Sequence, residues 1–273
     1  MESAFLCPVC GSPLTLDAKT ASCQNGHGYD RAKSGYINLL LSQRSADRQH
    51  GDDIGMVRAR KRFLDGLWYL PLWEAICRML PGNAPKDVLL DAGCGEGWYT
   101  ERLRSASGMQ TYGIDISKEA VNLAAKRDKG SLYAVASAFS LPFADRSVGI
   151  VTDFFAPLAE AEFSRVLAPG GFLLKVMPDK RHLYGLKTAI YDSVYETETD
   201  ETVPFGFSLV RKERVSFTVS LPDHETVAAL FSMTPYAHNT TSADLKKLDA
   251  LNGIVTECAF VLMLMRKTDG INS

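Results

Sequence analysis

The stretch Val88-Leu-Leu-Asp-Ala-Gly-Cys-Gly-Glu-Gly-Trp-Tyr-Thr100 decides the fold. It begins as a short apolar strand that ends at Asp91, passes through Gly93, Gly95 and Gly97, and leads into a helical pattern. Glycine adopts backbone angles that other residues avoid, and its missing side chain lets a ligand lie against the chain. The G-x-G-x-G spacing between a strand and a helix therefore predicts a ligand-binding turn in an α/β domain.

Strand and helix patterns alternate on both sides of this turn. Apolar runs predict strands at residues 88–91, 111–116, 132–136, 148–155, 172–177, 207–220 and 255–265. Helical spacing predicts helices at residues 56–80, 98–105, 118–127, 159–167, 182–195 and 225–233. Strands that alternate with helices form βαβ units. The sequence therefore predicts an α/β, Rossmann-like fold around a mainly parallel, seven-stranded sheet.

An acidic residue, Asp115, ends the strand after the glycine turn, 20 residues beyond Gly95. A carboxylate at this place can accept hydrogen bonds from ribose hydroxyls. The set resembles the cofactor site of class I methyltransferases, in which the turn holds the methionine part of S-adenosylmethionine. The resemblance implies that the cofactor contacts Asp91, Gly93, Gly95, Gly97, Asp115, Ser137 and Ala138. Ser137 stands where many such enzymes have Asp, which shifts the adenine contact toward backbone groups. The alternative is a set of tight turns in an unrelated α/β domain.

Three of the six cysteines lie in the first 23 residues, in a Cys7-x2-Cys10 pair and a Cys23-x3-His27 pair. Two thiolates from one knuckle and a thiolate and an imidazole from another form a tetrahedral ligand set, and structural zinc is the metal that prefers it. A shell of four protein ligands leaves no position for a reactive water. The alternative is free buried thiols with His27 at the surface, and the three remaining cysteines fit small core residues.

The 273 residues are enough for one α/β domain and an accessory module. We predict a zinc-binding, RNA-recognition domain at residues 1–41, a linker and helical segment at 42–84 and a cofactor-binding domain at 85–273. Residues 1–62 hold nine Lys and Arg against six Asp and Glu, a net charge of +3, and residues 63–273 hold 21 against 26, a net charge of −5. A basic module on an acidic body suits one part that meets RNA and one that does not.

The segment from His27 to Leu40, HGYDRAKSGYINLL, follows the metal ligands directly. Together with the zinc ligands and the glycine turn, it resembles the RlmA family, the 23S rRNA guanine-N1 methyltransferases, over nearly the whole chain. The resemblance implies a zinc knuckle that recognises RNA, a guanine acceptor in a hairpin loop of 23S rRNA (hairpin 35, domain II) and a homodimer in many members. It also implies that Tyr69, Gly95, Glu96 and His182 lie at the cofactor.

Asp153 ends the fourth predicted strand of the cofactor domain, at the edge where this fold binds its substrate. Guanine N1 carries a proton at neutral pH, so methylation there needs a proton acceptor. Asp153 is the candidate base, with Phe154, Phe155 and Pro157 as candidates to flank a flipped base. The alternative, weighed equally, is an Asp that is satisfied by nearby backbone groups or by Lys175.

Basic residues cluster near the zinc module, and they are candidates for contact with the RNA backbone. They are Arg31, Lys33, Arg58, Arg60, Lys61 and Arg62. A solvated helix face is the usual explanation for such a run.

Two other functions remain open on the sequence. One is a methyltransferase of a small molecule that uses the zinc knuckle as a scaffold, and the other is a non-catalytic zinc-containing protein that binds RNA or confers antibiotic resistance. The N-terminus lacks a signal peptide and no apolar run reaches the roughly 20 residues of a membrane span. We therefore expect a cytoplasmic protein, where thiols stay reduced.

Overall fold

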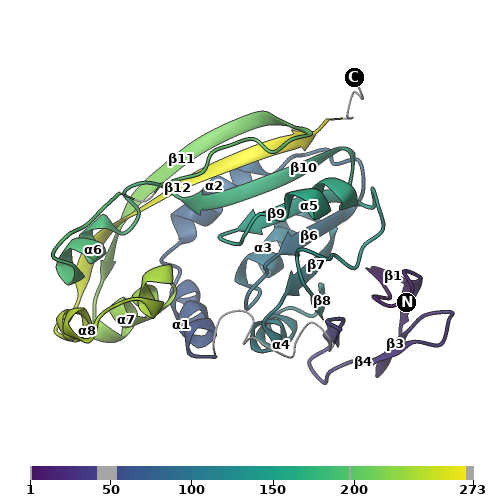
Figure 1. Cartoon of the computed structure of the whole chain (residues 1–273), viewed down its shortest axis with the longest axis horizontal. Helices are drawn as coiled ribbons and strands as arrows, with labels where there is room; N and C mark the ends of the chain where they lie inside the picture. Colours follow the sequence, from purple (N-terminus) through teal and green to yellow (C-terminus); the bar gives the residue numbers. More distant parts are fainter. Residues whose placement is uncertain (1, 42–53, 197, 269–273) are drawn as a thin grey trace.

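The computed structural model describes residues 2–41, 54–196 and 198–268, and within them it contains two β-sheets (Figure 1). The predicted linker at residues 42–53 lies outside the described residues. The smaller sheet has the order β1-β2-β3-β4, and the larger has the order β11-β12-β10-β9-β6-β7-β8-β5. The strands are β1 (Glu2–Leu6), β2 (Pro13–Leu16), β3 (Thr20–Ser22), β4 (Gly28–Asp30), β5 (Ile37–Asn38), β6 (Val88–Ala92), β7 (Gln110–Asp115), β8 (Leu132–Val135), β9 (Val148–Phe154), β10 (Leu167–Pro178), β11 (Phe207–Leu221) and β12 (Ile254–Lys267).

The larger sheet is mainly parallel, as the sequence predicts. Every pair from β5 across to β10 is parallel, while β12 runs antiparallel to both β10 and β11. Strand β9 is buried along its whole length, which explains why the central strands are apolar on both faces. The carboxyl ends of β6, β7, β8, β9 and β10 therefore meet at one edge of the sheet, where such folds bind their ligands.

The sheet has eight strands rather than the predicted seven. The additional strand, β5, comes from the N-terminal module and pairs in parallel with β8, with Ile37 opposite Ala134 and Asn38 opposite Val135. A two-residue strand gives no detectable period in the sequence, so only the tertiary structure reveals it. Its pairing joins the N-terminal module to the edge of the larger sheet.

Helices cover both faces of the larger sheet. They are α1 (Ile54–Asp65), α2 (Leu70–Met79), α3 (Trp98–Ser107), α4 (Lys118–Arg127), α5 (Glu160–Val166), α6 (Tyr184–Ile190), α7 (His224–Ser232) and α8 (Ser242–Asp249), with a 3₁₀ turn at Pro235–His238. Residues of α1, α2, α3, α6 and α7 share one apolar cluster with the sheet, α5 and the N-terminal strands share a second, and α4 shares a third with β8. None of the helices in the described part of the chain has the length and apolarity that a membrane span requires.

The helix predicted over residues 56–80 is two helices. Helix α1 ends at Asp65, Leu67 adopts a left-handed conformation with φ 61°, and α2 starts with Pro71 in its first turn. Proline lacks an N–H and disfavours a helical residue before it, so the chain bends there. The bend places α1 beside α7 and the glycine turn instead of in line with α2.

The N-terminal sheet packs firmly on the larger one. The Phe5 ring meets the rings of Tyr112 and Phe143 at centroid distances of 5.0 and 5.3 Å. The Ala4 N–H donates to the Tyr112 hydroxyl at 2.9 Å, and the Leu6 N–H donates to the Pro142 carbonyl at 2.8 Å. At the opposite end of the sheet, β11 and β12 carry α6, α7 and α8 (Figure 1).

Candidate cofactor, zinc and acceptor sites

The glycine turn between β6 and α3 forms a cradle at the carboxyl edge. Gly93, Gly95 and Gly97 have φ values of +85°, +54° and +83°, a region that other residues rarely adopt. A Cβ on Gly97 would lie 2.8 Å from Ala124 of α4, and a Cβ on Gly93 would lie 2.8 Å from the Ala156 side chain. Gly93 and Gly97 are therefore required by packing, whereas Gly95 is approached only by a flexible arginine side chain.

Two carboxylates hold this turn in place. Asp91 is buried and accepts hydrogen bonds from the hydroxyls of Thr100 (2.6 Å) and Thr152 (2.8 Å). Burial raises the pKa of Asp91 to about 6, although both hydroxyls favour its charged form. Asp115 accepts from the N–H of Gly95 at 3.0 Å and of Ser117 at 2.8 Å. A carboxylate at this place can accept hydrogen bonds from ribose hydroxyls.

Glu96 is the third acidic residue of the cradle, and it is 2% exposed. Its Oε1 has no hydrogen-bond partner among the described residues, and the closest ion pair is with Arg127 at 3.8 Å. Burial raises the pKa of Glu96 to about 7, against the opposing effect of Arg127 and Arg60. A buried acceptor without a donor beside a glycine cradle fits a ligand that brings donors, as S-adenosylmethionine does.

The predicted adenine contacts follow β8. The Ser137 hydroxyl accepts from the Phe139 N–H at 3.2 Å, so it closes a local turn. The Ala136 N–H donates to the Asp115 carbonyl at 3.0 Å, and this bond ties the segment to the end of β7. Ala138 packs on the apolar cluster around the N-terminal sheet. The N-terminal module thus packs against the segment that follows β8.

Tyr69 and His182 lie together in an aromatic cluster and not on the glycine turn. The His182 ring lies 4.5 Å from the Phe260 ring and 6.4 Å from the Tyr69 ring, and the Phe155 ring lies 5.6 Å from Phe260. The Ala259 N–H donates to His182 Nδ1 at 3.2 Å, which leaves the proton on Nε2. Burial lowers the pKa of His182 to about 3, so this histidine is neutral and can donate from Nε2.

Asp153 lies near the end of β9, directly opposite Lys175 of β10. It is 1% exposed, and neither carboxylate oxygen has a partner at hydrogen-bond distance and angle among the described residues. Burial raises the pKa of Asp153 to about 7, although Lys175 and the Ala156 backbone favour its charged form. Lys175 itself donates to the Asp200 carbonyl at 3.3 Å. Phe155, two residues on, is 44% exposed and left-handed, with φ 62°.

The four predicted metal ligands converge. Cys7, Cys10, Cys23 and His27 place their ligand atoms within 4.8 Å of one another. The Cys10–Cys23 sulfur distance is 3.7 Å, and His27 Nδ1 lies 3.6 Å from Cys7 Sγ and 3.4 Å from Cys23 Sγ. A tetrahedral zinc with bonds of about 2.3 Å to sulfur and about 2.0 Å to nitrogen needs separations of roughly 3.8 and 3.5 Å. The side chains therefore fit structural zinc.

Two contributors to these sites were not predicted from the sequence. The Tyr29 hydroxyl lies 3.0 Å from Cys7 Sγ, where it can donate to the thiolate. Arg127, the last residue of α4, reaches the glycine turn from a helix end that shows only an ordinary basic terminus in the sequence. An aromatic residue next to metal ligands was the available signal for Tyr29, while Arg127 had none.

The basic run of α1 is engaged with acidic residues of the protein. Arg58 lies 4.0 Å from Glu119, Lys61 lies 2.6 Å from Asp65, and Arg62 pairs with Glu225 of α7. The Arg60 guanidinium reaches the glycine turn, 3.6 Å from the place of a Cβ on Gly95. These pairs link α1 to neighbouring elements, and contact between this run and RNA stays a prediction.

The two basic candidates in the zinc module differ from each other. Arg31 donates to the carbonyls of Gly35 and Asp17 at 2.9 and 3.1 Å, so it shapes the loop that follows the metal site. Lys33, on the same loop, is exposed. A role for either residue in binding RNA stays a prediction.

Comparison with known families matches both halves of the chain. The family described as "RlmA, N-terminal" matches residues 5–46, and the family described as "Methyltransferase domain" matches residues 90–174. The zinc ligands fall in the first match, and most of the cofactor cradle falls in the second. The chain is therefore an S-adenosylmethionine-dependent methyltransferase with a structural zinc site.

Relatives align over almost the full length. A 23S rRNA (guanine(748)-N(1))-methyltransferase from Streptomyces fradiae is 33% identical over 261 residues, which cover 91% of this chain and 91% of that protein. The protein YxjB of Bacillus subtilis (strain 168), provisionally named a 23S rRNA (guanine-N(1)-)-methyltransferase, is 31% identical and covers 86% and 87%. The solved structure of YcgJ from Bacillus subtilis has a TM-score of 0.49 at 17% identity, over 72% of this chain and 98% of that one. By its identity to full-length relatives, this chain belongs to the RlmA family of 23S rRNA (guanine-N1)-methyltransferases.

Proposed function

We propose that this protein transfers a methyl group from S-adenosylmethionine to N1 of a guanine in hairpin 35, domain II, of 23S rRNA. The observation that carries the proposal is the carboxylate of Asp153, which is buried at the carboxyl edge and has no hydrogen-bond partner within the described part of the chain. The names of the full-length relatives support the same acceptor. The active site cannot reach a base that is stacked inside a duplex, so the guanine must be unstacked before it enters the site.

In this proposal Asp153 accepts the N1 proton of guanine. A carboxyl with a pKa of about 7 is ionised in a large share of molecules near neutral pH, and it is far more basic than an ordinary Asp. The sulfonium supplies an electrophilic methyl group, N1 forms the new N–C bond, and the electrons of the broken S–C bond remain on sulfur. The neutral His182 and the buried Asp91 do not compete for this proton because each has its own hydrogen bond.

The aromatic cluster would flank the unstacked base. Phe155 exposes its ring at the end of β9 in a backbone conformation that costs a non-glycine residue about 1–2 kcal/mol. Stacking on an aromatic side chain contributes about 1–3 kcal/mol per base. An exposed and strained phenylalanine two residues from the candidate base therefore fits a stacking surface for guanine.

We propose that residues 1–41 recognise the RNA and that residues 85–273 bind the cofactor. Residues 42–84 would form the linker and helical segment between these two domains. Arg31 and Lys33 would meet the RNA backbone beside the zinc site, with Arg58, Arg60, Lys61 and Arg62 on α1. Tyr69 and His182 would border the cofactor. The protein would act in the cytoplasm, where ribosomal RNA lies, and a homodimer is the expected assembly.

The test is transfer of a labelled methyl group from S-adenosylmethionine to total rRNA that lacks its own methylation, followed by mapping of the labelled nucleotide. We expect label at guanine N1 in hairpin 35, and no label in RNA with normal cofactor binding would overturn the proposal. Asp153→Asn should lower the single-turnover rate by 100-fold or more, on the order of general-base contributions. Asp145→Asn, an exposed acid whose ion pair is with Arg165, is the matched control.

A further inference from the structure

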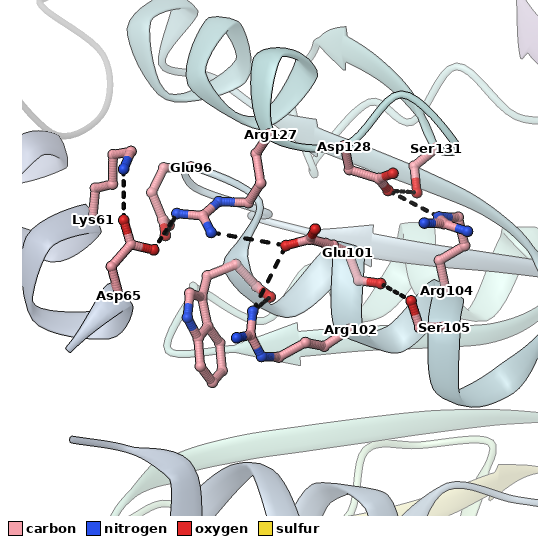
Figure 2. A network of polar contacts seen from close by, with 11 residues as sticks. Lys61, Asp65, Glu96, Glu101, Arg102, Arg104, Ser105, Arg127, Asp128 and Ser131 are labelled. Carbon is pink, nitrogen blue, oxygen red and sulfur yellow. Dashed lines mark hydrogen bonds and ion pairs between the residues drawn. The ribbon is translucent and has the colours of Figure 1, made fainter. Parts of the chain in front are cut away.

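A network of charged side chains joins α1, the glycine turn, α3 and α4 (Figure 2). Arg127 is at its centre and is 15% exposed. Its Nη2 lies 2.6 Å from Asp65 Oδ1 and 3.8 Å from Glu96 Oε1, and its Nη1 lies 3.8 Å from Glu101 Oε2. Lys61 binds the other oxygen of Asp65 at 2.6 Å. One guanidinium therefore faces three carboxylates from three different elements.

The three carboxylates differ in how much they depend on Arg127. Asp65 has a second cation in Lys61, and Glu101 lies 3.7 Å from Arg102. Glu96 is the most deeply buried of the three, and it forms an ion pair with Arg127 at 3.8 Å. Removing Arg127 thus leaves Glu96 with the largest loss of stabilisation, because an opposite charge matters most where water is excluded.

We infer that Arg127 is a positioning residue for cofactor binding, which holds the Glu96 carboxylate charged and in place by bridging it to Asp65 of α1. The inference rests on the proposed function only in taking S-adenosylmethionine as the ligand of the glycine turn. Asp65 has a double role in this arrangement. It anchors the Arg127 guanidinium from the α1 side, and its negative charge also competes with that of Glu96 for the same guanidinium.

Other charged and titratable groups that face Glu96 are Arg60 and Asp65 from α1, Tyr99 and Arg102 from α3, and Cys94 in the turn. Arg60 favours the charged form of Glu96 as Arg127 does, and Asp65 opposes it. Since Arg60 remains in an Arg127 variant, we expect the charged form of Glu96 to be less favoured but still populated. An opposite charge at this range lowers the pKa of a carboxyl by about 1–3 units.

The experiment measures the dissociation constant of S-adenosylmethionine by calorimetry from pH 6 to 9, with the full zinc-loaded chain and no RNA. With a Glu96 pKa of about 7 and an upward shift of one unit in Arg127→Gln, the ionised fraction falls about eightfold at pH 6.5 and about threefold at pH 7.5. The affinity should fall by the same factors. The amino group of the ligand titrates in this range too, but identically for every variant.

Glu96→Gln should remove this part of the pH dependence, and Arg127→Gln should then add little further loss in the double variant. Arg104→Gln is the matched control, since it breaks the 3.1 Å pair of α3 with Asp128 after α4 without touching Glu96 (Figure 2).

An Arg127→Gln midpoint equal to that of the unaltered protein would overturn the inference, and so would additive losses in the Glu96→Gln background. A purely structural role would weaken binding equally at every pH. Failure of RNA methylation with these binding shifts intact would count against the proposed acceptor and leave Arg127 in its role.

Discussion

Alanine at Gly97 should destabilise the protein well beyond the same change at Gly108. The two glycines lie at the two ends of α3, both left-handed, with φ +83° at the N-cap and +69° at the C-cap. A left-handed alanine costs about 1–2 kcal/mol at either position. A Cβ on Gly108 meets nothing within 4 Å, whereas a Cβ on Gly97 lies 2.8 Å from the Ala124 backbone and side chain. Such overpacking adds about 1–3 kcal/mol.

We therefore expect about 1–2 kcal/mol for Gly108→Ala and about 2–5 kcal/mol for Gly97→Ala, measured by urea unfolding followed by circular dichroism. The gain from a stiffer unfolded chain is common to both variants and cancels in the comparison. Equal losses for the two variants would refute the packing argument, since only the backbone conformation would then matter. Partial recovery in a Gly97→Ala, Ala124→Gly double variant would locate the side-chain part of the clash at α4, since the 2.8 Å approach to the Ala124 backbone remains.

Three further predictions follow from the buried and metal-binding groups. Tyr29→Phe removes the hydroxyl 3.0 Å from Cys7 Sγ, and zinc affinity measured by competition with a chromogenic chelator should fall about tenfold, while an unchanged affinity would show that this contact is idle. Removal of zinc with a chelator should lower the melting temperature of the whole chain, because the N-terminal sheet packs on Tyr112 and β5, the strand that follows that sheet, pairs with β8. A separate transition for the zinc module alone would contradict this. Asp153→Asn should be more stable than the unaltered protein at pH 8. Folding raises the pKa of Asp153 from 3.8 to about 7, so the unaltered protein loses stability as the pH rises across that interval, by roughly 4 kcal/mol at most. Urea unfolding at pH 4 and pH 8 checks it, and a stability difference that does not widen with pH would argue against a buried charge.

The sequence predicted the parts of the fold that have a period or a spacing. The central strands from β6 to β10 are apolar runs next to glycines and helical patterns, and the zinc ligands are separated by knuckle spacings. Both are local signals. The order of the strands at the edge was not predicted, because the pairing of β5 with β8 depends on residues 95 or more positions apart.

The break between α1 and α2 shows a different limit. Apolar residues over 56–80 keep a helical spacing, but the spacing carries no information on whether one helix or two produce it. Pro71 was the available signal for the break. The consequence reaches the site, since the bend puts the basic run of α1 against acidic partners and Arg60 against the glycine turn. A run of basic residues in a sequence predicts an RNA-binding surface only when it is known that acidic residues of the same protein do not pair with it.

Strain and unpaired charge gather at the carboxyl edge of this protein. Among the described residues, four that are not glycine have a left-handed backbone, and Leu67, Phe155 and Leu183 lie within two residues of Tyr69, Asp153 and His182. Glu96 and Asp153, both buried without full hydrogen bonding, lie at the same edge. Each such feature lowers stability by about 1–3 kcal/mol and persists only where the surrounding structure holds it. Their concentration at one edge indicates that the ligands, and not the fold, are what these groups are arranged to satisfy.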